Sequence, residues 1–137
     1  MRQFDVLVAS HGEVAAAMIE AAAMICGGQE GLAAVGLDPS ETPETFGARL
    51  EAAIDPSRPT LILTDLFGGT PNNVACSALR KSSVRCIAGV NLGLVIEAIT
   101  STEPLDDELV ARLVEIAREG VVDVASRLVR EEARPAH

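Results

Sequence analysis

The stretch TLILTDLFGGTP, residues 60–71, decides the fold, because it holds the clearest strand of the chain and the turn that follows it. Residues 60–64 are all β-branched or apolar, which predicts a buried strand. Gly68 and Gly69 interrupt that pattern. Thr70 followed by Pro71 predicts a helix N-cap with proline at the first helical position, and the helical pattern runs to about residue 80. The stretch is therefore one βα unit.

Similar βα units flank this one on both sides. The other predicted strands cover residues 4–9, 32–37 and 84–88, and the other predicted helices cover residues 13–26, 43–54, about 92–99 and about 106–119. Four such units predict an α/β fold with a doubly wound, mainly parallel sheet and helices on both faces. Right-handed crossovers make 2-1-3-4 the simplest strand order.

The whole chain, residues 1–137, is predicted to be a single domain, since no repeat, linker or low-complexity tract divides it. Val121, Val122 and Val124 fit either a short strand or another helical turn, and the pattern leaves both open. The tail from about Arg130 is predicted to be frayed.

Composition and charge exclude several classes of protein. The chain has 137 residues, of which 48% are hydrophobic and 23% charged, so it is not a disordered chain. Its net charge of −9, with no Trp and no Tyr, argues against binding to nucleic acid or to an anionic membrane surface. No apolar run approaches the roughly 20 residues that a bilayer span needs, so direct membrane insertion is not expected.

The three cysteines and the N-terminus indicate a reducing compartment. Cys26, Cys76 and Cys86 are odd in number, widely spaced and set in apolar runs, so we predict buried free thiols rather than disulfides or a metal site. The first residues show no secretory signal. We therefore expect a cytoplasmic protein without a bound metal.

Two side chains with complementary chemistry follow neighbouring strands. His11 comes after the first predicted strand and Asp65 after the third, and the winding reverses between these two strands. Each residue alone more often caps a turn. Together they suggest that Asp65 accepts a hydrogen bond from Nδ1–H of His11, which leaves Nε2 unprotonated and nucleophilic. Asn91 follows the fourth strand, is expected nearby and is a further candidate phosphate-binding residue.

The segment Gly68-Gly69-Thr70-Pro71 is a candidate phosphate site. Glycines allow a ligand to approach the backbone, and a helix start attracts anions. The alternative is a plain turn with a helix cap. The chain has no P-loop, no GxGxxG and no nucleophile elbow, so no nucleotide or other cofactor is expected. A histidine nucleophile, a carboxylate and an anion site together suggest a phosphohistidine carrier.

Three motifs in this order resemble the enzyme IIA domain of the mannose/fructose/sorbose class of the sugar phosphotransferase system (PTS). They are SHG at residues 10–12, TDLFGGTPNN at 64–73 and GVNL at 89–92, and the resemblance covers roughly residues 4–125. It implies that His11 is phosphorylated at Nε2, with Asp65 as its hydrogen-bonding partner and Thr70 as a phosphate contact. It also implies transfer from the phosphocarrier protein HPr to an enzyme IIB, here on a separate chain, and a homodimer with exchanged C-terminal segments.

The sequence departs from that family at two positions and leaves other functions open. Asn72 stands where many members carry Phe, and Gly93 where many carry Pro, which bears on partner preference. One alternative is a PTS-linked regulator whose phosphorylation state controls partner binding. The others are the related phosphoryl-donor subunit of dihydroxyacetone kinases and a non-enzymatic anion binder.

Overall fold

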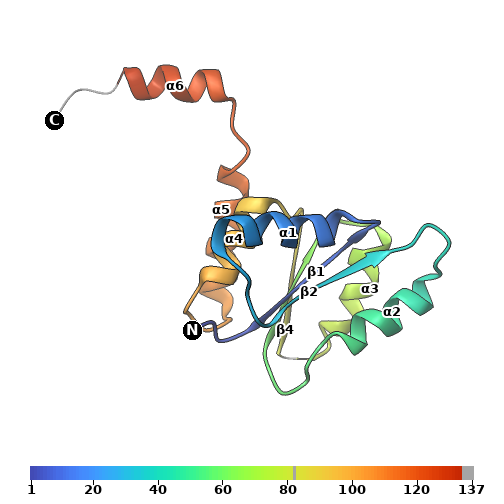
Figure 1. The fold of residues 1–137 in the computed structure, drawn as a ribbon. Helices are drawn as coiled ribbons and strands as arrows, with labels where there is room; N and C mark the ends of the chain where they lie inside the picture. The colour runs from blue at the N-terminus through green and yellow to red at the C-terminus, as the bar shows by residue number, and fades with distance from the viewer. Residues whose placement is uncertain (82, 134–137) are drawn as a thin grey trace.

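The computed structural model describes residues 1–81 and 83–133. In this part of the chain, one sheet of four parallel strands has the order β2-β1-β3-β4 (Figure 1), which confirms the predicted topology. The strands are β1 (Asp5–His11), β2 (Leu32–Leu37), β3 (Thr60–Thr64) and β4 (Val84–Ala88). The helices are α1 (Val14–Cys26), α2 (Pro43–Ala52), α3 (Thr70–Ala78), α4 (Leu92–Thr100), α5 (Asp107–Glu119) and α6 (Val124–Glu132).

Helices cover both faces of the sheet, as predicted. All five residues of β3 are buried, and their side chains alternate between two apolar clusters. Leu61 and Leu63 pack in the cluster that α1, α4 and α5 complete, whereas Ile62 packs in the cluster that α2 and α3 complete. A central parallel strand therefore needs a continuous apolar sequence.

Of the two helix N-caps predicted from the sequence, one is present and one is not. The Thr42 side chain accepts from the backbone N–H of Thr45 at the start of α2, as predicted. The predicted N-cap Thr70 is wrong, because Gly69 is the N-cap of α3 and Thr70 is already helical. The first turn closes one residue earlier than predicted, since the Asn73 N–H donates to the Gly69 carbonyl at 2.9 Å.

The C-terminal segment forms a helix. Residues 121–123 connect α5 to α6 and add no strand to the sheet of this chain, and α6 extends away from the body (Figure 1). Residues 130–132, the first part of the tail predicted to be frayed, are the last residues of α6. Asp123 caps this helix through Ser126. Residues 134–137 of that prediction lie outside the described residues.

The cysteines are free but not uniformly buried. Cys26 and Cys86 are partly buried, whereas Cys76 is exposed, so the predicted burial is wrong for Cys76. Its neighbour Ala75 faces the sheet, which turns Cys76 toward solvent.

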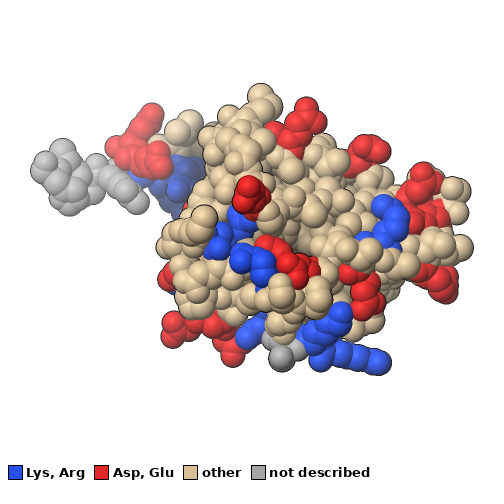
Figure 2. Space-filling view, turned by 60° about the horizontal axis from the view of Figure 1, so that its bottom comes forward, with Lys and Arg blue, Asp and Glu red and all other residues tan. Residues whose placement is uncertain are grey.

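Charged side chains of opposite sign lie beside one another on the face that Figure 2 shows. Pairs of this kind in the structure include Arg58–Asp5 at 2.8 Å and Lys81–Glu51 at 3.0 Å. Among the described residues, no helix has the length and apolar character needed to cross a membrane.

Candidate active site

His11 and Asp65 meet at the carboxyl edge of the sheet. His11 is the last residue of β1, and Asp65 directly follows β3, the strand next to β1. The strand order reverses between these two strands, which is where ligands bind in doubly wound folds. The predicted juxtaposition is therefore present in the structure.

One carboxylate oxygen holds His11 in place. The Oδ2 of Asp65 lies 2.8 Å from Nδ1 of His11 and accepts from the His11 backbone N–H at 2.9 Å. A carboxylate acceptor at Nδ1 places the ring proton there, so Nε2 keeps its lone pair. The imidazole side chain is 48% exposed and that of Asp65 only 16%, so the ring faces solvent while its partner is shielded.

The other oxygen of Asp65 has no partner. Oδ1 is the one buried side-chain N or O atom without a hydrogen bond in residues 1–81 and 83–133. An unpaired buried carboxylate oxygen is costly. Positive charge developing on the neighbouring imidazole would offset that cost.

Gly69 brings the start of α3 against the imidazole. A Cβ added to Gly69 would lie 2.9 Å from Cε1 of His11 and 3.5 Å from Nε2, so only glycine leaves room for the ring. Gly68 has a φ of +86°, which also favours glycine. Its carbonyl accepts from Nδ2 of Asn73 at 3.2 Å, which ties the loop to α3. Thr70, half-buried, opens the helix beside this loop.

Ser10 anchors the turn on the other side of His11. Its buried hydroxyl accepts from the Ala15 N–H at 2.7 Å and lies 3.0 Å from the His11 carbonyl oxygen, to which it donates. This contact joins the end of β1 to the start of α1. Sequence reasoning assigned Ser10 no role, because a bond across five residues falls outside the local capping patterns.

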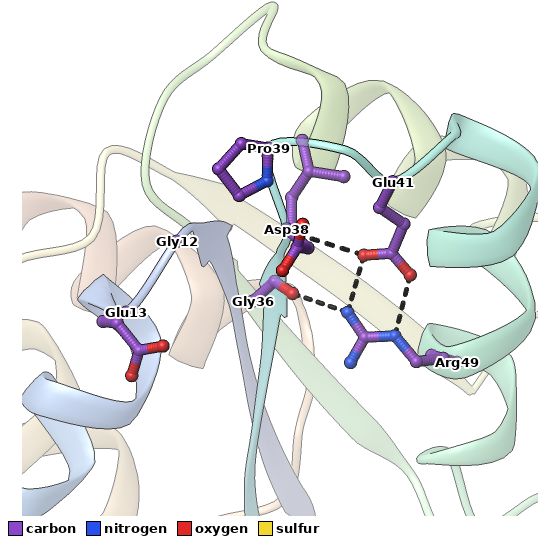
Figure 3. A pocket seen from close by; sticks show the side chains of 8 residues that line it. Gly12, Glu13, Gly36, Asp38, Pro39, Glu41 and Arg49 are labelled. Atoms are coloured by element: carbon purple, nitrogen blue, oxygen red, sulfur yellow. Dashed lines mark hydrogen bonds and ion pairs between the residues drawn. The ribbon is translucent and has the colours of Figure 1, made fainter.

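Arg49 and Glu41 hold the neighbouring end of β2 (Figure 3). Arg49 donates to both carboxylate oxygens of Glu41, at 2.9 and 2.7 Å, and to the Gly36 carbonyl at 2.5 Å. These bonds lower the pKa of Glu41 to about 2. Sequence reasoning missed this pair, because eight residues separate its members and no local pattern links them.

The pair borders a cavity of about 450 Å³ next to the histidine turn. Its walls include Gly12 and Gly36, and a Cβ on Gly36 would lie 2.1 Å from the Gly12 carbonyl oxygen. The Gly12 N–H donates to the Leu37 carbonyl at 2.9 Å. The end of β2 therefore supports the turn that follows His11.

Asn91 serves the fold rather than the histidine. Its Oδ1 accepts from the Leu94 N–H at the start of α4, and its Nδ2 donates to the Ala117 carbonyl of α5, both at 2.9 Å. In the described residues it makes no hydrogen bond to His11 or Asp65. No group of three or more His, Cys, Asp or Glu in this part of the chain is placed to hold a metal ion.

Two apolar side chains next to the site face solvent. Leu66 and Phe67 follow Asp65 directly and are 58% and 83% exposed. Sequence reasoning quoted both within a motif but gave them no role. Exposed apolar groups beside a reactive histidine are typical of a surface that meets another macromolecule.

Comparison with known proteins identifies the family. The sequence profile of the family described as PTS system fructose IIA component matches residues 5–115. This chain belongs to that family. It is therefore a PTS EIIA component of the mannose, sorbose and fructose class, a family of phosphotransferase components. The resemblance inferred from the three motifs is confirmed.

Three relatives of this EIIA component are named as specific for three different sugars. The chain is 35% identical to the mannose-specific EIIAB component of Escherichia coli strain K12, over 96% of this chain but only 42% of that protein. It is 28% identical to the sorbose-specific EIIA component of Lacticaseibacillus casei, over 90% of this chain and 93% of the other. A fructose-specific EIIA component of Bacillus subtilis strain 168 is 33% identical over 74% of this chain and 72% of that protein.

Solved structures of PTS IIA proteins share the fold. The mannose/sorbose-specific IIA subunit of Enterococcus faecalis has a TM-score of 0.83 and 34% identity, covering 90% of this chain and 95% of that chain. The IIA protein associated with the fucose utilization operon of Streptococcus pneumoniae has a TM-score of 0.82 and 31% identity, covering 93% and 99%.

Proposed function

We propose that this EIIA component is a phosphoryl carrier. His11 accepts a phosphoryl group from phospho-HPr and passes it to an enzyme IIB. The observation that carries the proposal is the 2.8 Å contact between Nδ1 of His11 and Oδ2 of Asp65, which leaves Nε2 of a half-exposed ring without that partner. Membership of the family supports the same chemistry.

In the transfer step, Nε2 of His11 attacks the phosphorus of the donor phosphohistidine. A new N–P bond forms as the donor's N–P bond breaks, and the donor imidazole leaves with that electron pair. Nδ1 of His11 keeps its proton, so the phosphorylated ring carries positive charge, which Asp65 stabilises. Passing the phosphoryl group to enzyme IIB reverses these roles. No metal or cofactor enters this scheme.

The start of α3 supplies the anion site in this proposal. Backbone N–H groups at a helix N-terminus and the positive end of its dipole favour phosphoryl oxygens. Gly68 and Gly69 let the backbone approach the ring, and the Thr70 hydroxyl donates to the phosphoryl group. Asn91 was predicted to take part, but its side chain is already bonded to α4 and α5, so we leave it out.

The proposal includes the partners and the setting of this component. HPr and enzyme IIB dock around His11, where Leu66 and Phe67 offer apolar contact. A homodimer formed through the C-terminal segment is supported by the exposed apolar residues of 121–129. The cytoplasm is the compartment that the proposal assigns, because the carrier works with HPr there.

Intact mass spectrometry tests the proposal directly. The protein is incubated with phosphoenolpyruvate, enzyme I and HPr, beside His11→Ala. We expect one acid-labile phosphoryl group on the wild type and none on the variant, and loss of the label when enzyme IIB is added. Equal labelling of the variant overturns the role of His11. A labelled protein that never discharges to enzyme IIB would favour a regulatory role.

A further inference from the structure

A buried amide lies directly behind the proposed anion site. Asn72 is the third residue of α3 and only 5% exposed, which is unusual for asparagine. Its Oδ1 accepts from the hydroxyl of Thr64, which is fully buried at the end of β3, with 3.1 Å between the oxygens. Burial of a polar side chain is costly unless its groups are satisfied.

The amide nitrogen of Asn72, unlike its oxygen, has no hydrogen-bond partner in the described residues. Among residues 1–81 and 83–133, Nδ2 makes no hydrogen bond, whereas Oδ1 is held by Thr64. In this part of the chain, Asp65 Oδ1 is the one fully buried side-chain N or O atom that lacks a hydrogen bond. Asn72 Nδ2 also lacks one, so it is not fully buried and keeps some contact with solvent. Neither of its N–H groups therefore donates to a protein acceptor in this part of the chain.

Strand alternation puts this amide on the same face of the sheet as the imidazole. Ala9 and Ile62 both pack in the cluster under α2 and α3. His11 and Thr64 each follow two residues later, so they point to that face as well. Thr64 pairs with Ala9 in the register of β1 and β3, and α3 begins at Gly69 against the His11 ring.

We propose that Asn72 is a further phosphate-binding residue, whose Nδ2 donates to an oxygen of the phosphoryl group on His11. Thr64 is the positioning residue, because its hydroxyl holds Oδ1 and so turns Nδ2 outward. The amide then adds a side-chain donor to the backbone N–H groups of the α3 start. This inference rests on the proposed function and adds a residue to its site.

Nuclear magnetic resonance of the side-chain amides tests the contact in the wild-type protein. Inorganic phosphate is titrated into ¹⁵N-labelled protein, and the Asn72 NH₂ signals are assigned by their loss in Asn72→Leu. We expect these signals to shift saturably with phosphate, and to shift further when His11 is phosphorylated. If the Thr70 backbone N–H shifts while the Asn72 amide does not, the inference is wrong. The phosphate titration needs no phosphoryl transfer, so it remains informative if the carrier function fails.

Kinetics of two near-isosteric variants test the contribution to transfer. Asn72→Leu removes both donors, and Asn72→Asp also brings a negative charge toward the phosphoryl oxygens. We expect the rate of His11 phosphorylation by phospho-HPr to fall about tenfold in Asn72→Leu and further in Asn72→Asp. Ser77→Asp adds the same charge on an exposed position of α3 and should change the rate less than about twofold.

Thermal unfolding separates binding from packing. Asn72→Leu alone leaves the buried Thr64 hydroxyl without its acceptor and should lower the melting temperature, whereas the double variant Thr64→Val/Asn72→Leu removes both partners and should keep it near the wild-type value. A slow but stable double variant supports the inference. A double variant that loses stability and rate together, or an Asn72→Leu that transfers at the wild-type rate, overturns it. If Asn72→Asp does not fold, Asn72→Leu and the amide shifts still decide the question.

Discussion

The backbone at Gly69 touches the imidazole of His11 so closely that a methyl group there would lie 2.9 Å from Cε1. Real side chains do not tolerate that approach, so the ring or the loop would have to move. Because the same ring is hydrogen-bonded to Asp65, a shift at Gly69 would also move Nε2 of His11. This contact makes the loop after β3 a determinant of histidine geometry.

Gly69→Ala is expected to slow His11 phosphorylation about tenfold, since small misplacements of reacting groups are costly. Its φ of −77° suits alanine, but alanine is a poor N-cap, so the free energy of unfolding should fall by about 0.5–1 kcal/mol. Gly93→Ala is the matched control, because its added methyl lies 3.7 Å from the nearest atom. That helical position should gain about 0.5–1 kcal/mol without a change in rate. Wild-type transfer by Gly69→Ala would show that the contact is unimportant.

Asp65→Asn is expected to fold but to slow phosphoryl transfer by about 100-fold, measured by quenched-flow labelling. The neutral amide no longer stabilises positive charge on the phosphorylated ring. The new amide nitrogen also replaces one of the two carboxylate oxygens. It then stands either at Oδ1, which is buried without a partner, or at Oδ2, to which two N–H groups of His11 donate. ¹⁵N spectra of the imidazole should show a mixture of tautomers in this variant. Wild-type kinetics together with an unchanged tautomer would remove Asp65 from the mechanism.

The Glu41–Arg49 pair predicts a specific loss of stability in acid. The pKa of Glu41 is lowered from 4.5 to about 2 by hydrogen bonds from Arg49. A carboxyl group whose pKa is lowered by folding stabilises the fold fully above pH 4.5. This stabilisation is lost as the pH falls toward 2. Arg49→Met should therefore be less stable than the wild type at pH 6 and closer to it at pH 3, as measured by urea unfolding. A constant difference between the two proteins would contradict this.

The cysteines should differ sharply in reactivity. Burial raises the pKa of Cys86 from 9.0 to about 11, so at pH 8 it is a thiol, whereas Cys76 is exposed. Iodoacetamide at pH 8 is expected to modify Cys76 first and to spare Cys86, as read by peptide mapping. Any stabilisation from the protonated Cys86 is present below pH 9 and is lost as the pH rises toward 11. Early alkylation of Cys86 would mean that β4 opens readily.

The C-terminal segment is expected to mediate self-association. Its exposed apolar side chains are Val121, Val122, Val124, Leu128 and Val129. Burying them against a second copy removes apolar surface from water. We expect a dimer by light scattering at tens of micromolar, and a monomer for the double variant Val124→Glu/Leu128→Glu. A monomeric wild type would overturn the dimer proposed above.

Local pattern was sufficient for most elements but not for their finest boundaries. β3 was predictable because a strand buried on both faces is built from β-branched and apolar residues. The start of α3 was misplaced by one residue, because Thr70 has the chemistry of a cap while the chain direction allows Gly69 to accept the first helical bond. Cys76 was misjudged for a related reason, since an apolar run does not reveal which residue faces outward.

By itself, the sequence determined the strand order, the two-faced sheet and the meeting of His11 with Asp65, because parallel βα units bring strand ends to one edge. Only the tertiary structure decided which side-chain groups already form hydrogen bonds within the protein. There, the Asn91 side chain is hydrogen-bonded to α4 and α5, whereas Nδ2 of Asn72 has no protein partner in the described residues. The tertiary structure also joined Glu41 to Arg49 beside the histidine turn. Such contacts depend on distances between segments remote in sequence, which no local pattern encodes.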